Sequence, residues 1–504
     1  MQGSFDLEIT GREGNEARGI SRRSFLGARA ALAGGTATLA VMGTAQAQEL
    51  DASRRDHDHN GRRDRDSEIA AASIAELQAA MASRRLSSVE LVGIYLRRIR
   101  DIDRGLDLKS IIQLNPDVFK IAAELDNERR RNGPRGPLHG IPVLLKDNID
   151  TADRMRTTAG SHALFGAAAP RDATVTARLR QAGAVILGKA NLSEWANFRG
   201  FGSSSGWSGV GGQCRNPYIL DRNPCGSSSG SGAAVSSALT SVALGTETDG
   251  SIVCPSGQCG VAGIKPTVGL TSRAGVVPIS ATQDTVGCHG RRLADAGTVL
   301  GALTGVDPRD ADRELKFFGQ ELMELAQDEI FDEATYLAAL ADGPRLGGTE
   351  GIDASLANHN VDVIVAPTNS PAWPTDLING DAFLFGSSGL AAAAGYPLVT
   401  VTGGYAFGLP IGITFMASAW SEPTLIRIAS GFEAAADVRR RPRFVKTFEA
   451  RNAQFDGSGS SANGSGGSYW NRTAEARART TGAAQRRNTM DRLTMPRTWR
   501  PTGL

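Results

Sequence analysis

The chain has 504 residues, of which 41% are hydrophobic and 21% charged, so it can bury a sizeable core like an ordinary globular protein. Its formal net charge of +2 is too small to indicate an acidic partner, and its six Trp, six Tyr and scattered Arg residues form no basic aromatic surface typical of nucleic-acid binding. The sequence contains no phosphate-binding loop and no Gly-x-Gly-x-x-Gly motif between a strand and a helix, so nucleotide binding lacks support.

Residues 1–47 have the order of an export signal. Arg22 and Arg23 precede a weakly apolar run that extends to Met42, and the small residues that follow fit cleavage after Ala47. The segment resembles a twin-arginine signal peptide, and a chance arginine pair before an apolar helix is the alternative. The run is too short and too rich in glycine for a transmembrane helix. We therefore expect an exported protein, periplasmic or secreted, with no stable membrane span.

Two further segments have little apolar surface to bury. Residues 48–68 are rich in Asp, Arg and His, which predicts a disordered charged linker. His57 and His59 lack a third ligand, so a solvated segment is favoured over a metal site, and we expect neither a metal nor a cofactor. Residues 449–504 begin with a Gly/Ser stretch and continue with many arginines, which predicts a disordered tail; contact with an anionic surface is the alternative.

The cysteines give an odd count of five. At least one of them therefore stays unpaired or pairs with another chain, and their spacings match no zinc ribbon or finger. We interpret Cys254 as a small core residue rather than a second nucleophile. The five residues are Cys214, Cys225, Cys254, Cys259 and Cys288.

Residues 69–448 lie between the two end segments and are expected to form one large domain. Capping boxes that begin at Ser73 and Ser87 predict helices over 73–83 and 87–103. A third helix is predicted over 116–131, because Pro suits its first turn and an Asn-Gly-Pro sequence follows it.

Strands and helices then alternate along the chain. The apolar run 141–145 predicts a buried strand with Lys146 at its end, and a helix over 174–182 leads to a second buried strand at 184–188. A helix is predicted to open at 191–195. Further strands are predicted at 261–266, 276–278, 361–366 and 398–401. This alternation indicates an α/β fold whose sheet is covered on both faces.

The stretch from Cys225 to Lys265 holds two loops rich in Ser and Gly. Ser227 and Ser251 lie one in each loop, 24 positions apart, and the run 233–244 between them predicts a buried helix that leads into a strand. Because Gly and Ser allow backbones to approach closely, such an arrangement can hold two hydroxyl groups in one pocket.

This stretch resembles the signature of the amidase signature family of serine hydrolases, and most of all that of bacterial peptide amidases. The resemblance rests on Gly226-Ser227-Ser228-Ser229-Gly230 and on Thr248-Asp249-Gly250-Ser251-Ile252-Val253-Cys254-Pro255. It extends to 138–148 and 365–368, and in all it covers roughly residues 70–448. It implies the amidase signature fold, in which a mixed central sheet is covered by helices on both faces.

The resemblance also implies the roles of individual residues. Ser251 attacks the carbonyl carbon, Ser227, in a cis peptide, relays a proton, and Lys146 acts as the general base. Lys146 must then be partly neutral; a solvated lysine titrates near about 10.4, and burial lowers that pKa. Asp147 would keep the proton on Lys146, but strand alternation points the two side chains to opposite faces. The main-chain N–H groups of Thr248, Asp249, Gly250 and Ser251 are assigned to the oxyanion hole, and Gly226, Ser228 and Ser229 to support of the turn.

One segment departs from the family pattern. After Asp310 the family carries a long further segment, whereas this chain reaches Phe317 within a few residues, which indicates an internal deletion near 311–316. We expect part of the family's sheet to be missing after residue 310, which would expose a sheet edge. The chain is then either a reduced amidase or an incomplete product of its gene.

The expected function is hydrolysis of a carboxamide, either a C-terminal peptide amide or a small amide, to a carboxylic acid and ammonia or an amine. An inactive or binding-only exported homologue is one alternative, because of the missing segment. The glutaminase subunit of a transfer-RNA amidotransferase is another, and the export signal weighs against it. A Ser-His-Asp hydrolase is disfavoured, since no Gly-x-Ser-x-Gly elbow with a fitting downstream order occurs.

Overall fold

The structure is a computed structural model that describes residues 64–200, 202–305, 307 and 333–448. The predicted export signal, the predicted tail and the apparent deletion near 311–316 lie outside the described residues. Of the predicted linker, residues 64–68 are described, and they are helical rather than disordered. Good helix formers in the Ile-Ala-Ala sequence that follows continue the same helix. In the described ranges, no helix combines the length and the apolar character needed to cross a membrane.

The helices at the start of the domain form where their capping signals predict them. Helix α2 is Ile74–Ala82 and helix α3 is Ser88–Arg98, and both begin with a complete capping box. Helix α3 continues as the π-helical turn η1, Ile99–Arg104, which completes the predicted helix over 87–103. Helix α4 is Val118–Asn132 and ends at Gly133, as the Asn-Gly-Pro sequence indicates.

A mixed sheet of nine strands forms the centre of the domain, in the order β1-β3-β2-β6-β8-β7-β10-β11-β9. Strand β2 pairs in parallel with β3 and β6, and the other pairs are antiparallel. Every residue of β2, β3, β6, β7 and β8 is buried, including charged residues such as Lys146, Lys189 and Glu247. The strands are β1 Ile111–Leu114, β2 Pro142–Lys146, β3 Val185–Ala190, β6 Val242–Glu247, β7 Ala262–Lys265, β8 Thr285–Gly290, β9 Ile364–Pro367, β10 Leu398–Ala406 and β11 Leu409–Met416. A separate ribbon pairs β4, Trp207–Ser208, with β5, Gly212–Gln213.

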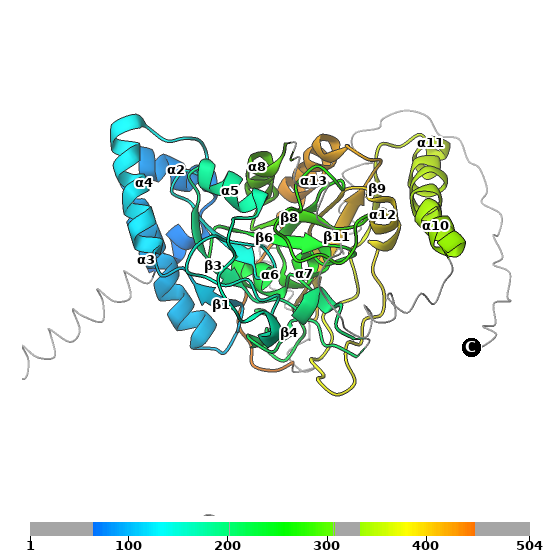
Figure 1. Ribbon diagram of the computed structural model, residues 1–504, viewed down its shortest axis with the longest axis horizontal. Helices are drawn as coiled ribbons and strands as arrows, with labels where there is room; N and C mark the ends of the chain where they lie inside the picture. Colours follow the sequence, from blue (N-terminus) through cyan, green and yellow to red (C-terminus); the bar gives the residue numbers. More distant parts are fainter. Residues whose placement is uncertain (1–63, 201, 306, 308–332, 449–504) are drawn as a thin grey trace, which may run out of the picture. The chain divides into compact units, whose positions relative to one another are not determined.

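Helices cover the sheet on both faces, as predicted. Helices α8 and α13 lie above the sheet in Figure 1 and pack against β7, β8 and β10, whereas α6 and α7 lie below it and pack against β6, β7, β10 and β11. The remaining helices are α5 Thr174–Gln181, α6 Ser229–Ser236, α7 Val253–Cys259, α8 Leu293–Leu303, α10 Glu333–Asp342, α11 Ala354–His359, α12 Gly389–Ala394 and α13 Glu422–Ala436, with short turns η2 His162–Leu164, η3 Glu194–Asn197 and η4 Gly343–Asp353.

Two predicted elements are wrong. In place of a helix opening at 191–195, the chain makes the turn η3, where Trp195, Ala196 and Asn197 all have positive φ. The main-chain N–H of Ser193 bonds to Ser227 and that of Trp195 to Ala159, so neither is available for a helix. The predicted strand at 276–278 is reduced to a single bridge, because its Pro278 has no N–H to donate to a ladder.

Strand β9 forms one edge of the sheet. Among the described strands it pairs only with β11, and its Val365 is 54% exposed. An apolar side chain on an unpaired edge is what the sequence predicts for a shortened sheet. That part of the family's sheet is missing stays a prediction, since the segment concerned is not described.

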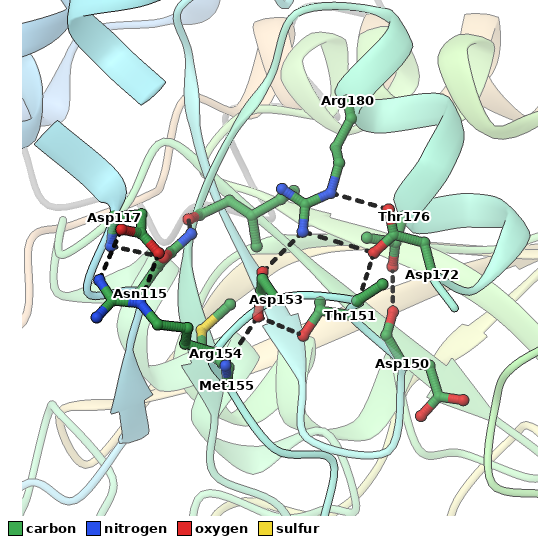
Figure 2. Close-up of polar contacts among 12 residues, drawn as sticks. Asn115, Asp117, Asp150, Thr151, Asp153, Arg154, Met155, Asp172, Thr176 and Arg180 are labelled. Carbon is green, nitrogen blue, oxygen red and sulfur yellow. Dashed lines mark hydrogen bonds and ion pairs between the residues drawn. The ribbon is translucent and has the colours of Figure 1, made fainter. Parts of the chain in front are cut away.

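The loop after β2 is fastened to helix α5 by charged side chains. Figure 2 shows Arg180 between Asp153 and Asp172, with nitrogen–oxygen distances of 2.7 and 3.0 Å. The Asp153 carboxylate also accepts the N–H of Met155 at 2.9 Å. Because this loop follows directly on Lys146, the contacts brace the end of β2.

Replacing Arg180 by Met is expected to lower the free energy of unfolding by about 1–2 kcal/mol, because two half-buried carboxylates each lose one hydrogen-bond donor and the cation that pairs with them. Urea denaturation measures the effect. Arg345→Met is the matched control: its partners Asp342 and Glu350 are exposed, and we expect no measurable change. Equal losses in both variants would contradict the role given to the Arg180 contacts.

Candidate active site

The sheet brings the two serine loops and the predicted lysine to one edge. Strands β2 and β6 are parallel neighbours, with Val143 opposite Val242, so their carboxyl ends lie side by side. Lys146 is the last residue of β2, and the turn that carries Ser251 follows the end of β6. The loop with Ser227 precedes helix α6.

Lys146 and Ser227 are in direct contact. The Lys146 Nζ lies 2.7 Å from the Ser227 Oγ, and it also donates to the Thr246 Oγ1 at 2.8 Å and the Thr246 carbonyl oxygen at 3.2 Å. Both side chains are completely buried. The peptide bond between Gly226 and Ser227 is cis, as the family resemblance implies.

Burial lowers the pKa of Lys146 to about 7, while the negative charges of Asp284 and Glu247 act in the opposite direction. Asp147 does not hold the proton on this amine. Its carboxylate accepts the N–H and the hydroxyl of Thr158, and its own pKa is raised by burial to about 6. Lys146 is thus poised to exchange a proton near neutral pH.

The two serine loops are bound to each other through their backbones. The Ser228 N–H donates to the Ser251 carbonyl oxygen at 3.0 Å, and the Ser228 Oγ donates to the Thr246 carbonyl oxygen at 3.1 Å. The Ser229 Oγ donates to the Cys225 carbonyl oxygen at 2.6 Å. These contacts fit the supporting role predicted for Ser228 and Ser229.

The hydroxyl of Ser251 does not join this pair. Its side chain is largely buried, with 8% exposed, and in the described part of the chain no hydrogen bond links its Oγ to Ser227. The structure therefore brings Lys146 and Ser227 together, and it links Ser251 to the same loop only through the main chain.

Glu247 organises the turn that carries Ser251, a role that the sequence analysis missed. Its carboxylate accepts the main-chain N–H groups of Gly250, Ile252 and Val253 at 3.0, 2.6 and 2.9 Å. The N–H of Gly250 is thus already occupied, although this residue was assigned to the oxyanion hole. Gly250 instead supplies the positive φ of +76° that the turn requires. An acidic residue at a strand end, just before a glycine turn, is the signal that could have revealed Glu247.

The other assigned N–H groups remain available. Among the residues that the structure describes, those of Thr248, Asp249 and Ser251 donate to no main-chain or side-chain acceptor. The Thr248 hydroxyl donates to Asp284 at 2.6 Å, which fixes the first residue of the turn.

A disulfide links the two serine loops. Cys225 and Cys254 are joined with a Cα–Cα distance of 5.9 Å, and both are buried. The thiols of Cys214, Cys259 and Cys288 are free and buried, so the prediction of unpaired cysteines is confirmed. The sequence left the pairing open. Cys254 is a buried core residue, as expected, and it is also a disulfide partner.

Two cavities adjoin the site. The larger, of about 510 Å³, is lined by both serine loops, by the disulfide and by Trp373, Phe383 and Asp381. The smaller, of about 220 Å³, is lined by Asn148, Thr246, Thr248 and Asp284 on the side of Lys146. In the described ranges, no group of three or more His, Cys, Asp or Glu side chains is placed to hold a metal ion.

Fold and site together define the chain as an enzyme of the amide-hydrolysing class. Residues 90–329 match the family model described as Amidase. A probable amidase from Arabidopsis thaliana is 37% identical over 485 residues, which cover 75% of this chain and 92% of that protein. The chain belongs to the amidase signature family.

Among solved structures, the peptide amidase of Stenotrophomonas maltophilia is 42% identical, with a TM-score of 0.69 over 74% of this chain and 98% of that one. The chain is also similar to one component of the glutamyl-tRNA(Gln) amidotransferase of Halorhodospira halophila, 42% identical over 47% of this chain and 48% of that protein. A putative amidase of Schizosaccharomyces pombe is 52% identical, but only 41% of its length is covered.

We expect the disulfide to contribute about 3 kcal/mol to the free energy of unfolding, because it closes a long loop in the unfolded chain. A reductant should therefore lower the Tm of the wild-type protein to that of the Cys225→Ala, Cys254→Ala double variant. The same reductant should leave the double variant unchanged, which controls for its effects on the other thiols. A wild-type Tm that does not respond to reduction would contradict the assigned pairing.

Proposed function

We propose that the protein hydrolyses a carboxamide, such as a C-terminal peptide amide or a small amide, to a carboxylic acid and ammonia or an amine. The observation that carries this proposal is the buried Lys146 amine at 2.7 Å from the Ser227 hydroxyl, with its pKa lowered to about 7. A lysine that is half neutral near pH 7 can accept a proton at little cost.

In the proposed reaction, Ser227 gives its proton to the neutral Lys146 and takes the proton of Ser251. The Ser251 oxygen attacks the carbonyl carbon, and the tetrahedral intermediate forms. The proton held by Lys146 passes through Ser227 to the leaving nitrogen as the C–N bond breaks, which leaves an acyl-enzyme. Water then attacks the ester through the same relay, and the acid and free Ser251 are released. The missing contact between Ser251 and Ser227 would form on substrate binding, since such bonds often tighten in the substrate complex.

The oxyanion hole is proposed at the free N–H groups of Thr248, Asp249 and Ser251. The Glu247 carboxylate accepts the neighbouring N–H groups of Gly250 and Ile252, so the turn is fixed before substrate binds. Donors that need no reorganisation stabilise a developing negative charge most effectively.

The larger cavity favours an uncharged or cationic acyl group. It is walled by the carboxylates of Asp249 and Asp381 and by the rings of Trp373 and Phe383, and no Lys or Arg side chain is among its described lining residues. A peptide amide fits such a cavity, whereas the α-carboxylate of free glutamine would find no cation there. This supports the peptide amide over the glutaminase alternative. The intact contact between Lys146 and Ser227 supports an enzyme over a binding-only homologue.

Export through Arg22 and Arg23 remains part of the proposal. A disulfide beside the proposed nucleophile suits an oxidising compartment, where such bonds persist.

A fluorophosphonate probe should label the wild-type protein at Ser251, and Ser251→Ala should lose the label together with at least about 10³-fold of its activity on a peptide amide. The exposed Ser83 serves as the control, and Ser83→Ala should keep both. Mass spectrometry of the labelled peptide identifies the site. A label that persists in Ser251→Ala, or no turnover of any amide by the wild-type protein before it is labelled, would refute the proposal.

The value of kcat/KM should rise with pH through about 7 and level off above it, because the protonated Lys146 cannot act as a base. An N-acetylated peptide amide is the suitable substrate, since it does not titrate between about pH 5 and 9 when its side chains are apolar. Lys146→Ala should stay inactive across the whole range. A flat profile over that range would exclude Lys146 as the base.

A further inference from the structure

We propose that Asp284 is a positioning residue of this site: it orients the turn that begins at Thr248 and holds a negative charge close to Lys146. The proposal rests on the proposed amide hydrolysis. Nothing in the sequence motifs points to Asp284, which lies 33 positions beyond Ser251.

The sheet places Asp284 beside the turn. Strand β8 runs antiparallel to β6, with Thr285 opposite Glu247, so the residue before β8 lies next to the residue after β6. These two residues are Asp284 and Thr248, and the Thr248 Oγ1 donates to the Asp284 Oδ1 at 2.6 Å.

The other oxygen of the Asp284 carboxylate is fixed as well. Its Oδ2 accepts the main-chain N–H groups of Ile279 and Ser280 at 2.7 and 3.0 Å. The carboxylate therefore cannot swing away from Thr248 without breaking two further hydrogen bonds. Two carboxylates therefore hold this turn. Glu247 accepts its main-chain N–H groups, and Asp284, next to β8, accepts the Thr248 hydroxyl.

Asp284 lines the small cavity together with Thr246, whose Oγ1 accepts a hydrogen bond from the Lys146 Nζ at 2.8 Å. The negative charge of Asp284 raises the pKa of Lys146, whereas burial lowers it. The effect of Asp284 is larger than that of Glu247 at the end of β6. From β8, His289 also faces Lys146, but burial lowers the pKa of His289 to about 3, so it is neutral.

Burial raises the pKa of Asp284 itself, whereas the bonds from Ile279, Thr248 and Ser280 and the charge of Arg273 act against that change. These four partners favour the ionised carboxylate. The positioning and the charge of Asp284 are thus two separate contributions, and two variants can separate them.

Asp284→Asn keeps the shape and a hydrogen bond to Thr248 but removes the charge. Without that charge the pKa of Lys146 falls further, so the acid limb of the kcat/KM profile should move to lower pH by about half a unit. Asp150→Asn is the matched control, because Asp150 lines the same cavity but is not among the charges that act on Lys146, and its acid limb should not move.

Thr248→Val keeps the charge and removes the hydroxyl. Its acid limb should match that of the wild type, while kcat should fall about tenfold with little change in KM, because a misplaced turn weakens the transition state. Thr248→Ser, which restores the hydroxyl, should recover most of the lost kcat.

An unmoved acid limb in Asp284→Asn would overturn the electrostatic role, and full kcat in Thr248→Val would overturn the positioning role. If Asp284→Asn does not fold, Thr248→Val still decides whether the bond positions the turn. Failure of the proposed function gives a different result: the wild-type protein would then hydrolyse no amide, or Ser251→Ala would remain active.

Discussion

The desolvation of one amine governs the rest of this structure. Lys146 ends a strand in which every residue is buried, and its Nζ meets only Ser227 and Thr246 among the described residues. Removing an ammonium group from water favours its neutral form, whereas two carboxylates beyond the first contacts favour the charged form. A pKa of about 7 is the balance of these two effects. Without the sheet around it, the same lysine would remain protonated.

The loops around this amine are held by contacts of several kinds. A main-chain hydrogen bond joins Ser228 to Ser251, a disulfide joins Cys225 to Cys254, and the Glu247 carboxylate fills the turn after β6. Each contact constrains a different part of the two loops. Such constraints suit a site whose donors must be in place before the reaction starts.

The sequence predicted the elements whose signals are local. The capping boxes at Ser73 and Ser87 placed the starts of two helices, and the apolar run before Lys146 placed β2. The serine loops were recognised because their motif lies within one continuous stretch. The helix predicted to open at 191–195 is wrong, because the main-chain N–H of Trp195 donates to the distant Ala159 rather than within a helix.

What the sequence could not predict depends on which strands are neighbours. Glu247 and Asp284 meet at the turn only because β8 pairs with β6, and no local pattern in either segment states that pairing. Thr246 becomes a partner of Lys146 for the same reason, through the pairing of β2 with β6. The pairing of Cys225 with Cys254 likewise follows from how α6 and α7 pack against each other.

The bond between Cys225 and Cys254 closes a covalent ring that contains both Ser227 and Ser251. A protease that cut the backbone once inside this ring would divide the polypeptide, yet the two fragments would stay tethered through sulfur. Both hydroxyl groups would then remain in one molecule, so a nicked form would separate into two pieces only after reduction.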